Sequence, residues 1–107
     1  MTETSPNSST TQAAIDPQGF VSGLVDFENA GRLKQAGEAL IAKAESDLTF
    51  DLAGIQAANS VTVALLAGWL RCARLREIAI SFTGVPDKLM AIIVVCGLDK
   101  VLPINNA

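Results

Sequence analysis

The chain has 107 residues, a net charge of −3 and hydrophobic side chains at half of its positions. This length fits one domain with its own hydrophobic core and excludes a second. Charged residues make up only 18% of the chain, whereas soluble domains usually carry about 25%. Because a free monomer normally has a more charged surface, we expect a subunit of a larger complex or a homodimer.

The residue content excludes several classes of function. The net charge is negative and Lys and Arg form no dense run, so we expect no binding to nucleic acid. The sequence has no histidine, which is the usual acid–base catalyst at neutral pH, and no glycine-rich phosphate loop. We therefore expect no enzyme, no catalytic residue, no cofactor and no metal. Cys72 and Cys96 lie in apolar runs and are expected to be buried, reduced thiols.

The N-terminal part of the chain predicts a tail, a hairpin and a helix. Residues 1–12 are rich in Ser and Thr and offer little apolar surface, so we predict a flexible tail there and a folded domain over 13–107. The start of the chain also lacks the features of a secretory signal, which predicts a cytoplasmic protein. Residues 13–16 and 20–25 predict two strands joined by a turn. Asp26 then fits the N-cap of a helix that runs to about Ala44.

The centre of the chain is a strand that leads through a polar elbow into an apolar helix. Residues 47–52 predict the strand, and Asn59 and Ser60 form the elbow. Either side chain can accept a hydrogen bond from the free N–H groups of the first turn, so we expect the helix to begin near Ser60. The uncharged run 52–70 is long enough to raise the question of a membrane span. The polar elbow interrupts it, so we expect no membrane insertion.

A 3.6-residue repeat gives this helix two different faces. The face that we expect to be buried, with Trp69 at its centre, consists of Val61, Leu65, Leu66, Trp69, Cys72 and Ala73. The opposite face consists of Ser60, Val63, Ala64, Ala67, Arg71 and Arg74. Small side chains let another backbone come close. We therefore predict a partner-binding site made of Asn59, Ser60, Val63, Ala64, Ala67 and Arg71. The alternative is an ordinary alanine-rich helix side with the arginines as a solvated rim.

The C-terminal part contains conflicting signals. Residues 78–82 predict a second central strand, which implies a parallel crossover from the first. The run 91–96 is rich in β-branched residues and suits a buried strand, whereas Pro86 and Gly97 suit the two ends of a helix. Residues 101–104 predict a short edge strand, since proline is tolerated only at an edge.

Ser60 has two possible roles. As a purely structural residue it caps the helix. As a functional residue it is a candidate phosphorylation site, because the helix dipole would stabilise a phosphate at this end and the added charge would alter the predicted binding face.

The order of these motifs resembles the STAS domain, the fold of sulfate-transporter C-terminal domains and of anti-sigma-factor antagonists. The resemblance spans about residues 13–103. It is carried by Asp51-Leu52, Ile55, the Asn59-Ser60 elbow, Gly84-Val85-Pro86-Asp87-Lys88 and Val101-Leu102-Pro103. Within the family, the chain is most similar to the small STAS subunits of Mla-type phospholipid-trafficking ABC transporters.

This resemblance implies an α/β fold with a mixed sheet and helices packed mainly on one side, and it favours a helix at 91–96. It also implies binding rather than catalysis: a cytoplasmic subunit, held at the inner membrane by its complex, that binds the ATPase subunit and supports its assembly and activity. The family's phosphorylated hydroxyl corresponds to Ser60. The anti-sigma antagonists have Asp before that serine and Gly soon after it, whereas this chain has Asn59, Val61 and Thr62. These differences favour constitutive docking, and a regulator switched by phosphorylation of Ser60 is the alternative.

Overall fold

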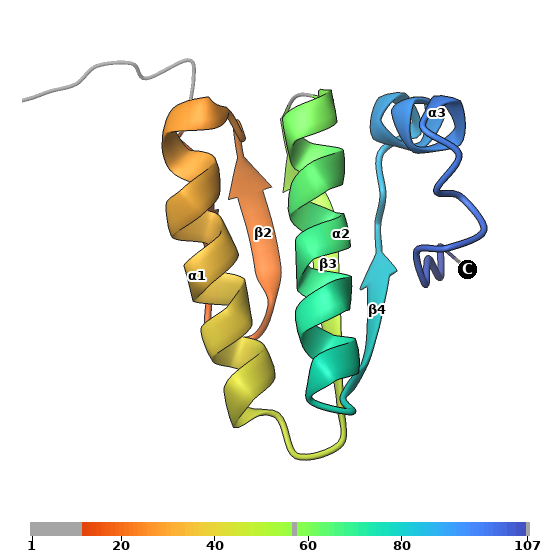
Figure 1. Ribbon diagram of the computed structural model, residues 1–107. Coiled ribbons are helices and arrows are strands. Elements are labelled where there is room, and N and C mark those ends of the chain that lie inside the picture. The colour runs from red at the N-terminus through yellow and green to blue at the C-terminus, as the bar shows by residue number, and fades with distance from the viewer. Residues whose placement is uncertain (1–11, 57, 107) are drawn as a thin grey trace, which may run out of the picture.

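A computed structural model describes residues 12–56 and 58–106 of the chain. The described part contains a four-stranded sheet in the order β1-β2-β3-β4 and three helices (Figure 1). The elements are β1 (Ala14–Ile15), β2 (Phe20–Gly23), α1 (Phe27–Lys43), β3 (Asp47–Ile55), α2 (Ser60–Leu75), β4 (Ala79–Thr83) and α3 (Asp87–Val95). Strands β1 and β2 are antiparallel, and β2, β3 and β4 are mutually parallel, so the sheet is mixed.

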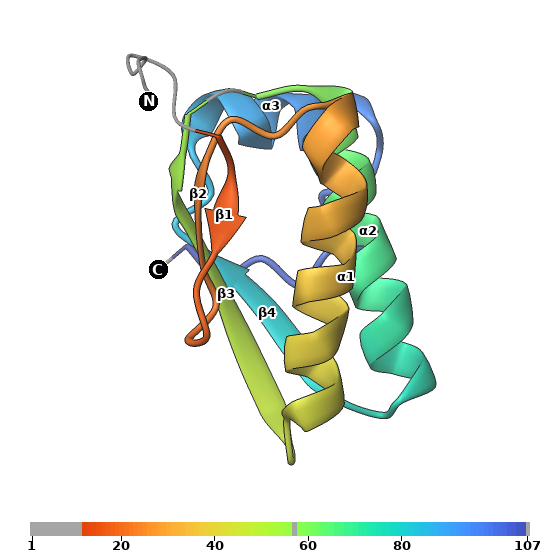
Figure 2. The ribbon, with the colours of Figure 1, turned by 90° about the vertical axis from the view of Figure 1, so that its left-hand side faces the viewer.

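Helices α1 and α2 cover one face of this sheet, and α3 crosses the end at which β3 and β4 finish (Figure 2). The opposite face carries exposed or half-buried side chains such as Thr49 and Ser81, whose hydroxyl groups lie 3.2 Å apart. This arrangement confirms the expected α/β fold with helices mainly on one side. Most of the tail predicted at 1–12 lies outside the described residues, but Gln12 pairs with Leu24 through a single β-bridge.

The hairpin and the first helix were predicted correctly. Asp26 is the N-cap of α1, and it forms a capping box with Asn29 in which each side chain accepts a hydrogen bond of 2.9 Å from the other residue's backbone N–H. The Asn29 side chain is buried and also donates to the carbonyl of Leu24 at 2.8 Å. The start of α1 is therefore fixed to the end of β2.

The core centres on Trp69, as the helix pattern predicts. Its indole is fully buried and stacks on Phe50 of β3, with ring centroids 4.5 Å apart and planes at 10°. The indole N–H donates to the Lys34 carbonyl of α1 at 3.2 Å. A Cβ atom at Gly37 would overlap the indole ring, so close packing of α1 on Trp69 requires glycine at this position.

Several boundaries differ from the predictions. Strand β3 continues past Leu52 to Ile55, because its last residues pair with Ser22 and Gly23 of β2. The edge strand predicted at 101–104 is wrong: it reduces to a bridge between Ile104 and Phe82, because the preceding residues form a turn.

The β-branched run forms a helix. Helix α3 ends at Val95, and Gly97 follows with φ +74°, the left-handed conformation that glycine adopts easily after a helix. The predicted burial of both cysteines is wrong, since Cys72 is half-buried and Cys96 is exposed at the end of α3. Among the described residues, no helix is long and apolar enough to cross a membrane.

Candidate docking surface

Asn59 builds the elbow between β3 and α2. It is the N-cap of α2, with an extended backbone, and its Oδ1 atom accepts hydrogen bonds from the backbone N–H of Thr62 at 2.8 Å and from the Thr62 hydroxyl at 2.9 Å. Its Nδ2 group donates to the carbonyl of Val25 at 2.9 Å. Thr62 is fully buried, so its hydroxyl depends on this partner. Asn59 is therefore the capping residue that the sequence could not distinguish from Ser60.

Ser60 is the exposed first residue of α2. Its hydroxyl makes no hydrogen bond to another residue in the ranges 12–56 and 58–106. Since Asn59 provides the cap, the Ser60 hydroxyl is left to interact with molecules outside the fold.

Four of the six predicted binding residues lie along the outward side of α2. Ser60, Ala64 and Arg71 are exposed and Ala67 is half-buried, at intervals of three or four residues that place them on one side of the helix. We call these four residues the α2 ridge. It is low and smooth at its N-terminal end and becomes basic toward Arg71, as the sequence predicts.

The prediction that Val63 belongs to this surface is wrong. Val63 is only 3% exposed and belongs to the core. It precedes Ala67 by one turn, on the flank of α2 that faces α3 and the segment following it. Helix α2 packs against α1, the sheet and α3, so more than half of its circumference is buried. The sequence pattern divides the helix into one buried and one exposed face and therefore misses this third contact.

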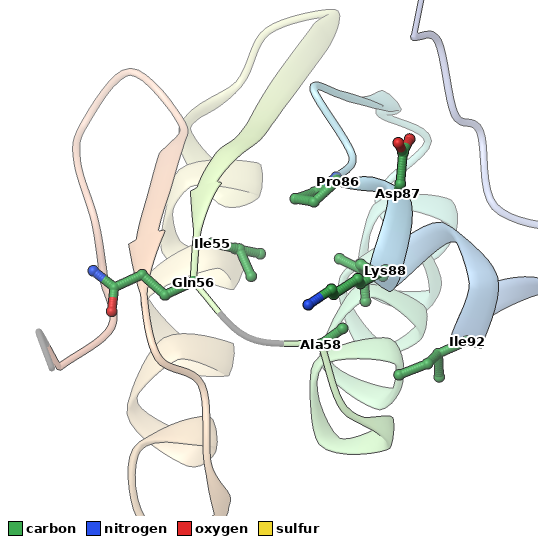
Figure 3. Close-up of a pocket in the computed structure, with 8 residues that line it drawn as sticks. Ile55, Gln56, Ala58, Pro86, Asp87, Lys88 and Ile92 are labelled. Atoms are coloured by element: carbon green, nitrogen blue, oxygen red, sulfur yellow. The ribbon is translucent and has the colours of Figure 1, made fainter.

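A pocket next to the elbow was not predicted. It has a volume of about 580 Å³ and lies between the end of β3, Ala58 and the first two turns of α3 (Figure 3). Lys88 reaches toward Ile55 and Ala58, while Asp87 points away from them. The lining residues come from two segments about thirty residues apart in the sequence, so no local pattern predicts this pocket. The one sequence feature that relates to it is Pro86, the N-cap residue of the helix that follows β4. In the described ranges, no cluster of acidic or cysteine side chains could hold a metal ion.

Comparisons with known proteins relate this chain to one family. A family model described as "Mlab, STAS domain" matches residues 14–103. The MlaB subunit of the Acinetobacter MlaFEDB complex in an ATP-bound conformation is 38% identical, with a TM-score of 0.73, over 80% of this chain and 90% of that one. A second ATP-bound structure of that complex matches with 31% identity and a TM-score of 0.70, over 91% of this chain and 100% of that one.

A third solved structure is an anti-sigma factor antagonist from Mycobacterium paratuberculosis. It is 26% identical with a TM-score of 0.71, over 90% of this chain and 86% of that one. A search of curated proteins finds no significant match. The match of the family model covers most of the chain and the solved structures agree with it. The chain belongs to the MlaB group of the STAS domain family.

Proposed function

We propose that this chain is a non-catalytic accessory subunit of an Mla-type phospholipid-trafficking ABC transporter. In this role it binds the cytoplasmic ATPase subunit, supports its assembly and activity, and is held at the inner membrane through the complex. The observation that supports this proposal best is the 38% identity, over nearly the whole folded region, to the MlaB subunit of a complex solved in an ATP-bound state. The homodimer expected from the composition stays a prediction.

We further propose that the α2 ridge makes the contact with the ATPase. Ser60 and Ala64 are exposed, and their small side chains allow a partner backbone or helix to approach α2 closely. The hydrogen bonds of Asn59 hold this end of α2 against the connection between β2 and α1, so the N-terminal end of the ridge is fixed within the fold before a partner binds. A preformed surface loses little conformational entropy on association, which favours a stable complex.

The proposal is tested by co-expressing the chain with the ATPase of the Mla-type transporter from the same organism. The wild-type pair should co-elute in size-exclusion chromatography. Ala64→Arg should abolish co-elution, because it places a long charged side chain at the centre of the α2 ridge. Ala42→Arg is the matched control, since Ala42 is an exposed helical alanine outside the ridge. If Ala64→Arg is folded by circular dichroism and still co-elutes, the ridge is not the contact surface.

A second candidate function is a regulator switched by phosphorylation of Ser60. It is favoured by the exposed Ser60 hydroxyl and by the 26% identity to an anti-sigma factor antagonist. Intact mass measurement of the chain purified from its native cells tests this function. A phosphorylated fraction that maps to Ser60 supports the regulator, whereas unmodified protein bound to the ATPase supports the accessory subunit.

A further inference from the structure

A groove runs along the seam between α1 and α2, which lie side by side on one face of the sheet (Figure 1). It consists of two adjoining hollows of about 370 and 480 Å³. Lys34 lines both hollows, and its side chain lies against Gly68 of α2 at the point where the two hollows meet. Ala64 of the α2 ridge lines the first hollow and Arg71 lines the second, so the groove and the ridge are parts of one surface.

The first hollow is apolar and contains an aromatic side chain that the fold does not use. Phe27, the first residue of α1, is 88% exposed. Its neighbours in the hollow include Ala30, Gly31 and Ala64, which are too small to cover the ring. Exposed aromatic residues next to a hollow of small residues are typical anchors of protein interfaces.

The second hollow is positively charged. Arg71 and Arg76 line it and are exposed. Lys34 and Glu38, which also line it, form an ion pair of 2.8 Å and neutralise each other. This is the single salt bridge among the described residues, so neither arginine has a carboxylate partner there.

This concentration of positive charge contrasts with the net charge of −3 of the whole chain. The dipole of α2 favours cations in its last turn, which accounts for Arg74 and Arg76 but not for Arg71 one turn earlier. The charge of the groove is therefore complementary to an acidic partner.

We propose that this groove binds an acidic amphipathic helix of the ATPase subunit. The apolar face of that helix packs on Phe27, and its carboxylates pair with Arg71 and Arg76. The stretch of α1 from Phe27 to Glu38 is about 16 Å long, which matches roughly three turns of a partner helix. This inference rests on the proposed function and adds the chemistry of the segment that the chain recognises.

Photo-crosslinking tests the apolar end of the groove. p-Benzoylphenylalanine replaces Phe27 in the chain co-expressed with the ATPase, and the irradiated complex is analysed by mass spectrometry. We expect a crosslink to a helical ATPase segment that contains Asp or Glu. The matched control places the same residue at Phe20, an exposed aromatic that precedes the buried Val21 in β2 and so lies on the other face of the sheet, where it should give no such crosslink.

Charge reversal tests the basic end. The double variant Arg71→Glu and Arg76→Glu should weaken the affinity for the ATPase at least tenfold and reduce its dependence on salt. Lys100→Glu, outside the groove, changes the charge with the same sign and should leave the affinity within about twofold.

The outcomes separate the two proposals. If the wild-type chain binds the ATPase but position 27 does not crosslink to it, crosslinks to a second copy of this chain, or crosslinks to a segment without acidic residues, the groove inference is wrong and the accessory function stands. If the wild-type chain does not bind the ATPase at all, the proposed function is wrong.

Discussion

Asn59 and Ser60 are adjacent residues with different roles. Asn59 uses both ends of its amide: Oδ1 accepts from Thr62, and Nδ2 donates to the carbonyl of Val25. The anti-sigma-factor antagonists named above have aspartate at this position. An aspartate could cap the helix, but it has no N–H group to donate to the carbonyl of Val25. The asparagine is therefore explained by a contact between the elbow and the connection from β2 to α1.

The first prediction concerns this residue pair. Asn59→Ala should lower the free energy of unfolding by about 1–3 kcal/mol, because α2 loses its cap and the buried Thr62 hydroxyl loses its partner. Ser60→Ala should change it by less than about 0.5 kcal/mol, as expected for an exposed side chain without a structural role. Urea unfolding measures both values. Equal losses in the two variants would contradict the assignment of the cap to Asn59.

At the scale of single residues, the sequence predicts the kind of side chain but not always its task. The polar elbow follows from local pattern, whereas the choice of Asn59 over Ser60 depends on Val25, which is far away in the sequence. The same holds for Val63, whose burial depends on the position of α3 rather than on the period of its own helix.

At the scale of elements, the two glycines of α1, Gly31 and Gly37, lie in opposite environments. A Cβ atom at Gly37 would overlap the Trp69 ring, whereas a Cβ atom at Gly31 would have no heavy atom within 4 Å. Gly37 is thus required for helix packing. Gly31 lines the open groove, where extra bulk would meet only solvent or a partner.

This contrast gives the second prediction. Gly31→Ala should raise the free energy of unfolding by up to about 1 kcal/mol, since alanine favours the helix and meets no neighbour. Gly37→Ala should lower it by about 1–3 kcal/mol despite the same gain in propensity, because the methyl group forces α1 away from Trp69. Thermal or urea unfolding of both variants provides the test. Stabilisation by Gly37→Ala would contradict the close packing of α1 on the Trp69 ring.

The run 91–96 carries conflicting local signals for a strand and for a helix. Its β-branched residues favour a strand by propensity, yet most of the run is helical. Pro86 and Gly97 mark the two ends of the helix, and Leu89 and Ile93, which are buried and four residues apart, fit the helical repeat. The groove between α1 and α2 was not predictable in this way. Its residues belong to two helices, and their meeting depends on how the helices pack on the sheet.

At the scale of the whole molecule, Trp69 connects the layers. It stacks on Phe50 of β3, donates to Lys34 of α1 and belongs to α2. A third prediction follows. Its fluorescence and the far-ultraviolet circular dichroism should change together in urea, as in a two-state transition with a slope of about 1–3 kcal/mol per molar. Two separate transitions would mean that the helical layer and the sheet unfold independently.

The segment after α3 affects how readily the sheet could aggregate through its edges. The Phe82 backbone N–H donates to Pro103 at 2.9 Å and its carbonyl accepts from Asn105 at 2.8 Å, while the Asn106 amide bonds both backbone groups of Val85. Residues 103–105 thus pair with the free edge of β4 at Phe82, and the opposite edge, β1, is only two residues long. Unpaired strand edges are templates for aggregation. In the described chain, the β4 edge is blocked at Phe82 and the β1 edge is too short to recruit a foreign strand, so both features oppose growth of the sheet into fibrils even though the chain carries so little charge.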